Sequence, residues 1–189
     1  AAKVITVSPT YAKEILTPAF GYGLDDVVRR RAGDLRGILN GVDREEWNPE
    51  ADEHIAAAFS AKKPAGKAQC KTALLRELDL ATDRDVPLVG VVSRLWEQKG
   101  LDLAVSVLPK FLREGSLQFV LLGSGDAGLE NEFKRLAVDF PELCAVRIGY
   151  DNGLSHRIEA GCDFFLMPSR FEPCGLNQMY SMAYGTLPI

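Results

Sequence analysis

The stretch PLVGVVSRLWEQKGLDLAVSVLPKFLREGSLQFVLLG, residues 87–123, alternates between two hydrophobic patterns. Its short apolar runs at 87–93 and 118–123 are bounded by turn residues, as is typical of strands covered on both faces. Between them, apolar residues recur every three or four positions from Leu101 to Leu112, which predicts a helix with one buried stripe. Pro109 interrupts the stripe, so we expect a kink or a late break there. The stretch predicts a strand–helix–strand unit.

The same alternation continues to the end of the chain. The further predicted elements are a helix striped from Leu129 to Phe140, a strand at 144–149, a short helix at 155–161, a strand at 163–168, a helix striped from Leu176 to Ala183 and the start of a strand at 187–189. Strands and helices that alternate with short connections form parallel sheets with right-handed crossovers. We therefore predict an α/β fold, a Rossmann-like parallel sheet with helices on both faces, cut off before its last strands.

The first 86 residues are less regular. The predicted elements are a strand at 4–7, a helix capped by Ser8 or Thr10 and continuing through Leu16, a helical segment at 24–34, a strand at 37–42, a surface excursion at 44–66 and an amphipathic helix at 67–80. The chain opens without methionine and closes inside an apparent strand, so we expect a fragment.

Composition excludes several classes of function. Of the 189 residues, 47% are hydrophobic and 25% charged, and the net charge of −4 offers no basic field for nucleic acid. Neither a signal peptide nor eighteen consecutive apolar residues is present, which indicates no membrane partner. Four scattered cysteines without a CxxC pair suggest neither zinc nor disulfides. Reduced thiols favour a cytoplasmic location.

Candidate site residues follow the predicted strands, where open parallel sheets bind ligands. Arg94 and Lys99 follow the strand at 87–93 and could converge on one anionic group, although two exposed basic side chains would also satisfy the pattern. Residues 123–128, GSGDAG, match G-x-G-x-x-G, and Asp151 lies where a ribose-binding acid would be expected. This match supports an alternative, an NAD-binding oxidoreductase domain.

Two observations count against the NAD interpretation. A whole strand–helix unit precedes GSGDAG, whereas the fingerprint normally opens the first such unit. The charge of Asp126 would also oppose a pyrophosphate unless the side chain caps the helix. A tight turn at Gly123 that lets a nucleotide approach the backbone fits either interpretation.

The segment SRFEPCGLNQ, residues 169–178, follows the strand at 163–168. Pro173 confines Glu172 to an extended conformation, and the amides of Gly175 and Leu176 at a helix N-terminus form an anion site. A carboxylate beside an anion site favours function, with a helix-capping Glu172 as the alternative. Cys174 has no nearby histidine, so we expect it to line or pack rather than to act as a nucleophile.

Seven strings together resemble the bacterial glycogen synthase and plant starch synthase family almost end to end: VITVSPTYAKEILTP, GILNGVD, WNPEAD, VSRLWEQKGLDL, LGSGD, the run from IGYDN to SRFEPCGLNQMY, and YGTLP. SRFEPCGLNQMY is the most specific of them. Members of this family are two-domain GT-B-type enzymes that transfer glucose from ADP-glucose to the non-reducing end of an α-1,4-glucan with retention of configuration. The resemblance implies the end of an acceptor-side domain at 1–36 and a donor-binding domain at 37–189, incomplete at its C-terminus.

The resemblance also implies roles for individual residues. Arg94 and Lys99 match the basic pair that holds the donor diphosphate, and Glu172 matches the glutamate beside the donor glucose; these three form the predicted catalytic set. The remaining predicted substrate-binding residues are Asn40 near the glucose, Gly123, Tyr150 against the adenine, Cys174, the phosphate-binding amides of Gly175 and Leu176, and Asn177.

The predicted partners are therefore ADP-glucose and an α-1,4-glucan, with no cofactor and no metal. The wider clan often places a ribose-binding glutamate eight positions after Glu172, where this sequence has Tyr180, so ribose recognition is left unassigned. We expect the chain to be inactive alone and to be cytoplasmic, or plastidial in a plant. A non-catalytic sugar-nucleotide or glucan-binding module is a further alternative.

Overall fold

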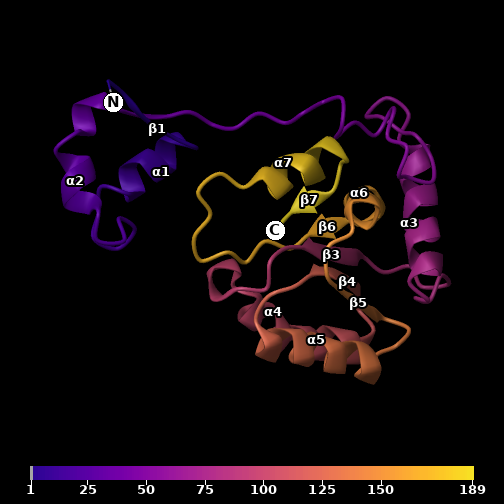
Figure 1. Cartoon of the computed structure of the whole chain (residues 1–189). Helices are drawn as coiled ribbons and strands as arrows, with labels where there is room; N and C mark the ends of the chain where they lie inside the picture. Colours follow the sequence, from indigo (N-terminus) through magenta and orange to yellow (C-terminus); the bar gives the residue numbers. More distant parts are fainter. Residues whose placement is uncertain (1) are drawn as a thin grey trace. The chain divides into compact units, whose positions relative to one another are not determined.

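A computed structural model describes residues 2–189, which form two compact units (Figure 1). The first contains the chain up to Val42 together with Glu172–Leu176. The second contains Asp43–Phe171 and Asn177–Ile189. The two domains predicted from the sequence, residues 1–36 and 37–189, stay predictions.

The first unit is a small two-stranded parallel sheet with short helices. Its elements are β1 (Val4–Thr6), α1 (Pro9–Glu14), α2 (Asp25–Arg29), the 3₁₀ turn Ala32–Asp34 and β2 (Leu35–Gly37). The Ser8 hydroxyl caps α1 by accepting the Tyr11 amide at 2.9 Å. The strand predicted at 37–42 is wrong in position, because β1 ends where the chain turns into α1. Pairing therefore stops once Ile38 donates to the Thr6 carbonyl.

The second unit contains a five-stranded sheet in the order β5-β4-β3-β6-β7, and each neighbouring pair is parallel. Its strands are β3 (Leu88–Val92), β4 (Gln118–Gly123), β5 (Cys144–Ile148), β6 (Phe164–Phe165) and β7 (Leu187–Pro188). The helices are α3 (Ala65–Glu77), α4 (Leu101–Glu114), α5 (Ala127–Asp139) and α6 (Asn152–Gly161), followed by α7 (Leu176–Ala183). The predicted α/β parallel-sheet class is confirmed.

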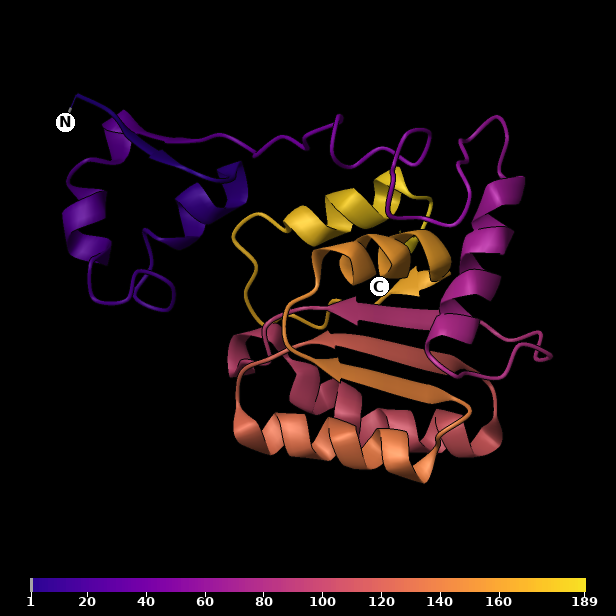
Figure 2. The same ribbon diagram turned by 45° about the vertical axis from the view of Figure 1, so that its right-hand side comes forward.

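Helices cover both faces of this sheet, and Figure 2 shows α4 and α5 on one side and α3 and α6 on the other. Successive side chains along β3 and β4 point to opposite faces of the sheet, so both strands contribute to the apolar cluster on each face. Val91 and Phe119 pack with Phe133 toward α4 and α5. Leu88 and Val120 pack on the opposite face with α3 and α6. The two-sided burial explains why β3 and β4 are apolar throughout.

Two local predictions differ from the structure. The helix α4 continues through Pro109 to Glu114, so the expected break at Pro109 does not occur, and Gly115 with φ +64° caps the C-terminal end of the helix. The segment 44–66 is not a mere surface excursion. Phe59 is buried in an apolar cluster with Cys70 of α3, Ala160 of α6 and Tyr184, and Trp47 packs against this cluster. The aromatic side chains of this polar stretch therefore contribute to the core.

Within residues 2–189, no helix combines the length and the apolar character that a membrane crossing would require.

Candidate functional site

The loops after β3 and β4 are joined at the carboxyl edge of the sheet, which is the side where its parallel strands end. The Leu95 amide donates to the Ser124 carbonyl at 2.9 Å, and the Asp126 amide donates to the Leu95 carbonyl at 2.8 Å. A Cβ atom at Gly123 would lie 1.9 Å from the Ser93 carbonyl oxygen. Only glycine therefore allows the two loops this close an approach.

The loop after β6 is tied to the loop after β3. The Arg170 amide donates to the Gln98 carbonyl at 2.9 Å, and its guanidinium donates to both carboxylate oxygens of Asp102 at 2.7 and 2.6 Å. The hydrogen bond from Arg170 holds the pKa of the Asp102 carboxyl below its ordinary value. At Gly100, φ is +64° and a Cβ atom would meet the Pro168 carbonyl oxygen at 2.0 Å. These contacts fix the backbone that carries Lys99.

A pocket of about 290 Å³ lies over the carboxyl ends of β3, β4 and β5. Four of the residues predicted from the sequence line it: Arg94, Gly123, Tyr150 and Asn177. The structure thus brings together residues that lie up to 83 positions apart, from Arg94 to Asn177 (177 − 94). Further lining residues include Trp47, Asp151, Ser155, Glu159 and Tyr180.

The predicted pocket residues differ in how much of each is exposed. The Tyr150 side chain is 90% exposed, so its ring is open to a planar ligand. Arg94 is also exposed, whereas Asn177 is half-buried and donates its side-chain amide to the Val92 carbonyl at 2.6 Å. The bond from Asn177 ties α7 to the end of β3.

Both acids that bear on the NAD interpretation, Asp151 in its favour and Asp126 against it, cap helices. Asp126 accepts the Leu129 amide at the start of α5 at 2.9 Å. Asp151 accepts the Leu154 amide at the start of α6 at 2.8 Å. Their carboxylates therefore satisfy free helix amides, which is an ordinary structural role for aspartate at these positions.

The other predicted residues are not among those that line the pocket. Lys99 is half-buried in the 3₁₀ turn Glu97–Lys99. Asn40 and Glu172–Leu176 belong to the first unit, in which Asn40 is exposed and Glu172 and Cys174 are half-buried. The roles assigned to these residues by resemblance stay predictions.

Sequence reasoning missed Glu159, a pocket-lining residue of α6 that is only 1% exposed. Its Oε2 atom has no hydrogen-bond partner among the described residues. Burial raises the pKa of this carboxyl well above its ordinary value, although the nearby positive charge of Lys67 opposes the shift. The available signal was an acid within a helix whose neighbours Leu154, Ile158 and Ala160 are apolar.

An aromatic cluster that sequence reasoning also missed supports the pocket wall. Trp47 stacks on His156 and on Tyr180, with ring centroids 4.0 Å apart in each case. Asp52 contacts the His156 ring nitrogen at 2.8 Å and accepts a hydrogen bond from Tyr184. Burial opposes ionisation of Asp52, but the hydrogen bonds from Tyr184, His54 and His156 prevail and lower its pKa. The available signal was the string WNPEAD, quoted above only for its resemblance.

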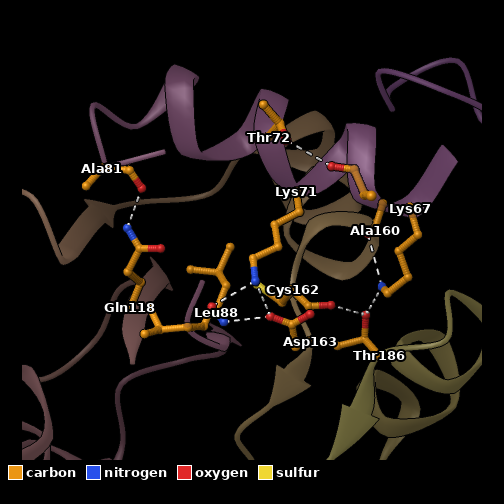
Figure 3. A network of polar contacts seen from close by, with 12 residues as sticks. Lys67, Lys71, Thr72, Ala81, Leu88, Gln118, Ala160, Cys162, Asp163 and Thr186 are labelled. Atoms are coloured by element: carbon orange, nitrogen blue, oxygen red, sulfur yellow. Dashed lines mark hydrogen bonds and ion pairs between the residues drawn. The ribbon is translucent and has the colours of Figure 1, made fainter. Parts of the chain in front are cut away.

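The amino edge of the same sheet carries a separate polar network (Figure 3). Asp163 accepts the Leu88 amide and the Lys71 ammonium through one oxygen, at 2.7 Å each. Lys67 donates to the Thr186 hydroxyl at 2.7 Å and to the Ala160 carbonyl at 3.1 Å. This network joins α3 to the starts of strands and to the end of α6.

Within the described residues 2–189, no group of three His, Cys, Asp or Glu side chains is placed to hold a metal ion.

Comparisons with known proteins agree with this architecture. The family described as "Glycosyl transferases group 1" matches residues 86–189, and the one described as "Starch synthase catalytic domain" matches residues 1–30. The chain belongs to the group 1 glycosyltransferases. Within them it is similar to glycogen and starch synthases, and the resemblance inferred from the sequence is confirmed.

Three relatives show how far the similarity extends. A glycogen synthase from Anaeromyxobacter sp. (strain Fw109-5) is 60% identical over 97% of this chain and 38% of its own length. The catalytic domain of starch synthase IV from Arabidopsis thaliana, solved with ADP and acarbose, is 42% identical with a TM-score of 0.91, over 100% of this chain and 39% of that one. Sucrose-phosphate synthase from Thermosynechococcus elongatus, 20% identical with a TM-score of 0.61 over 100% of this chain and 40% of that one, shares the fold. The chain thus spans about two fifths of the length of each of these three proteins.

Proposed function

We propose that this chain is the donor-binding part of a glucosyltransferase that moves glucose from ADP-glucose to the non-reducing end of an α-1,4-glucan. The observation that carries the proposal is the pocket at the carboxyl edge, where Arg94 and the exposed Tyr150 ring line one cavity. A ring and a guanidinium suit the two ends of a nucleoside diphosphate. The starch synthase of matching fold was solved with ADP, which supports the choice of nucleotide.

In the proposed reaction the bond between glucosyl C1 and the diphosphate oxygen breaks, and C1 bonds to the acceptor hydroxyl oxygen. The acceptor proton leaves with the released ADP. Negative charge grows on the diphosphate as the bond breaks, and Arg94, Lys99 and the amides of Gly175 and Leu176 are the groups proposed to stabilise it. Retention of configuration follows if attack and departure use the same face of the sugar.

Titration of the chain with ADP-glucose, ADP and NADH tests the proposed donor. We expect saturable binding of ADP-glucose and ADP and none of NADH. Arg94→Ala should weaken ADP binding about tenfold, since a charge-assisted contact with the diphosphate is lost. Arg113→Ala, which removes an exposed arginine on α4, is the matched control and should leave ADP affinity unchanged. Binding of NADH in preference to ADP-glucose would favour the oxidoreductase alternative.

Glu172 is proposed to orient the donor glucose and to support positive charge at the anomeric carbon. In a full-length glycogen synthase carrying this segment, Glu172→Gln keeps the side-chain shape and removes the charge. Turnover should fall by orders of magnitude, since each ~1.4 kcal/mol of lost stabilisation is tenfold in rate. The affinity for ADP, which lacks glucose, should stay the same. Normal turnover with a lower melting temperature would assign Glu172 to helix capping instead.

A further inference from the structure

Three buried side-chain atoms in the described residues have no hydrogen-bond partner: Gln118 Oε1, His156 Nε2 and Glu159 Oε2. Of these three residues, Glu159 is the one that lines the pocket. An unpartnered polar atom in a folded interior costs about 1–3 kcal/mol, so a buried carboxyl beside a cavity calls for an explanation. A ligand that enters the cavity could supply the missing partner.

Three neighbouring polar side chains that line the pocket, Ser155, Asn177 and Asp151, already have partners within the protein. The Ser155 hydroxyl donates to the Asn152 carbonyl at 2.6 Å. The Asn177 amide donates to the Val92 carbonyl, and the Asp151 carboxylate accepts the Leu154 amide. Glu159 therefore offers hydrogen-bonding capacity that the protein itself leaves unused.

We propose that Glu159 recognises a ribose hydroxyl of the donor nucleotide. The inference rests on the proposed nucleotide binding. With the base against Tyr150 and the diphosphate at Arg94, the ribose is the covalent link between them and must cross the cavity that all three side chains line. Sugar hydroxyls both donate and accept hydrogen bonds, and so does a protonated carboxyl.

The position of Glu159 suits recognition better than catalysis or charge pairing. Its carboxyl is buried on α6, and the main chain at Glu159 and Ala160 is fixed by hydrogen bonds to their carbonyl oxygens. The Thr186 hydroxyl oxygen lies 2.5 Å from the Glu159 carbonyl oxygen, and Lys67 donates to the next carbonyl, that of Ala160. Burial raises the pKa of the carboxyl, which favours its neutral form, although the positive charge of Lys67 opposes the shift. A buried carboxyl held on a packed helix is suited to binding hydroxyls rather than phosphate.

Nucleotide analogues test the assignment. The chain and three variants would be titrated with ADP, 2′-deoxy-ADP and 3′-deoxy-ADP, and separately with GDP as a probe of base recognition. We expect the wild type to bind ADP about three- to tenfold more tightly than one of the deoxy analogues. Glu159→Met should abolish that preference by weakening ADP alone. Glu159→Gln, which keeps a donor and an acceptor, should retain part of it.

Gln118→Met is the matched control, because it removes a buried side chain with an unpartnered oxygen that does not line the pocket. It should lower the melting temperature and leave the deoxy preference intact. The inference alone is overturned if the wild type binds all three nucleotides equally, a result that needs no variant to fold. It is also overturned if Glu159→Met lowers the affinity for all three adenine nucleotides by the same factor. A change in the preference for ADP over GDP in this variant would likewise overturn it, because Glu159 would then contact the base. Failure of the wild type to bind ADP at all would remove the proposed function together with this inference.

Discussion

The amino and carboxyl edges of the five-stranded sheet, where its parallel strands begin and end, differ in how their polar residues are used. At the amino edge, Lys71 and Asp163 contact each other, and Asp163 also binds the first amide of β3 (Figure 3). At the carboxyl edge, Arg94 and Tyr150 are exposed around a cavity, and buried Glu159 has an oxygen without a partner. Satisfied polar groups stabilise a fold, whereas unsatisfied groups beside a cavity are available to a ligand. The comparison therefore separates residues that hold this sheet together from residues available for binding.

The largest expected effect concerns Lys99 at the carboxyl edge. In a full-length glycogen synthase carrying this segment, Lys99→Ala should lower kcat by about 10²–10³, because the charge that it meets is largest in the transition state. Steady-state kinetics with ADP-glucose and a glucan primer measures this effect, and Lys110→Ala on the exposed side of α4 is the control. A raised KM with unchanged kcat would limit Lys99 to ground-state binding.

A smaller effect, on stability rather than turnover, is expected at the amino edge. Asp163→Ala removes the acceptor shared by Leu88 and Lys71 and should lower the free energy of unfolding by about 2 kcal/mol. Urea denaturation measures the loss, with the exposed Asp83→Ala as control. Affinity for ADP should not change in Asp163→Ala. A weakened ADP affinity in a folded Asp163→Ala protein would contradict the separation of the two edges.

Measured per pH unit, the smallest expected effect is a pH dependence of stability that arises from Glu159. Because burial raises its pKa in the folded state, the folded protein holds a proton that the unfolded chain releases above about pH 4.5. Its stabilising contribution is complete below that pH and is lost as pH rises toward the raised pKa. The slope is at most about 1.4 kcal/mol per pH unit. Unfolding curves from pH 5 to 8 should show wild type losing stability relative to Glu159→Gln. Parallel pH profiles would mean that the carboxyl is already ionised.

Much of the second unit could be predicted from sequence periodicity, because its strands are buried on both faces and its helices carry one apolar stripe. The predicted strand at 118–123 and β4 coincide. The helix expected at 155–161 begins earlier, at Asn152, because Asp151 caps it. The strand expected at 37–42 was wrong, since a three-residue ladder depends on its partner β1 and leaves little local signal.

The candidate site was only partly predictable. Arg94 and Gly123 could be chosen because they lie where predicted strands end, and Tyr150 and Asn177 because of the resemblance to glycogen and starch synthases. All four line the pocket. Glu159 could not be chosen in this way. It lies inside a helix, where its apolar neighbours indicate burial but the missing hydrogen-bond partner and the adjacent cavity cannot be read from the sequence.

By itself the sequence determined the parallel α/β layer, its likeness to glycogen and starch synthases and several of the residues that line the pocket, because these depend on local periodicity and short strings. Tertiary structure alone decided that Trp47 stacks on His156 and Tyr180, and that Glu159 lies beside the same cavity as Tyr150. Such contacts join segments as far apart as 133 positions, from Trp47 to Tyr180 (180 − 47). Whether a polar atom in them finds a partner depends on packing of the whole unit, which no single stretch of sequence encodes.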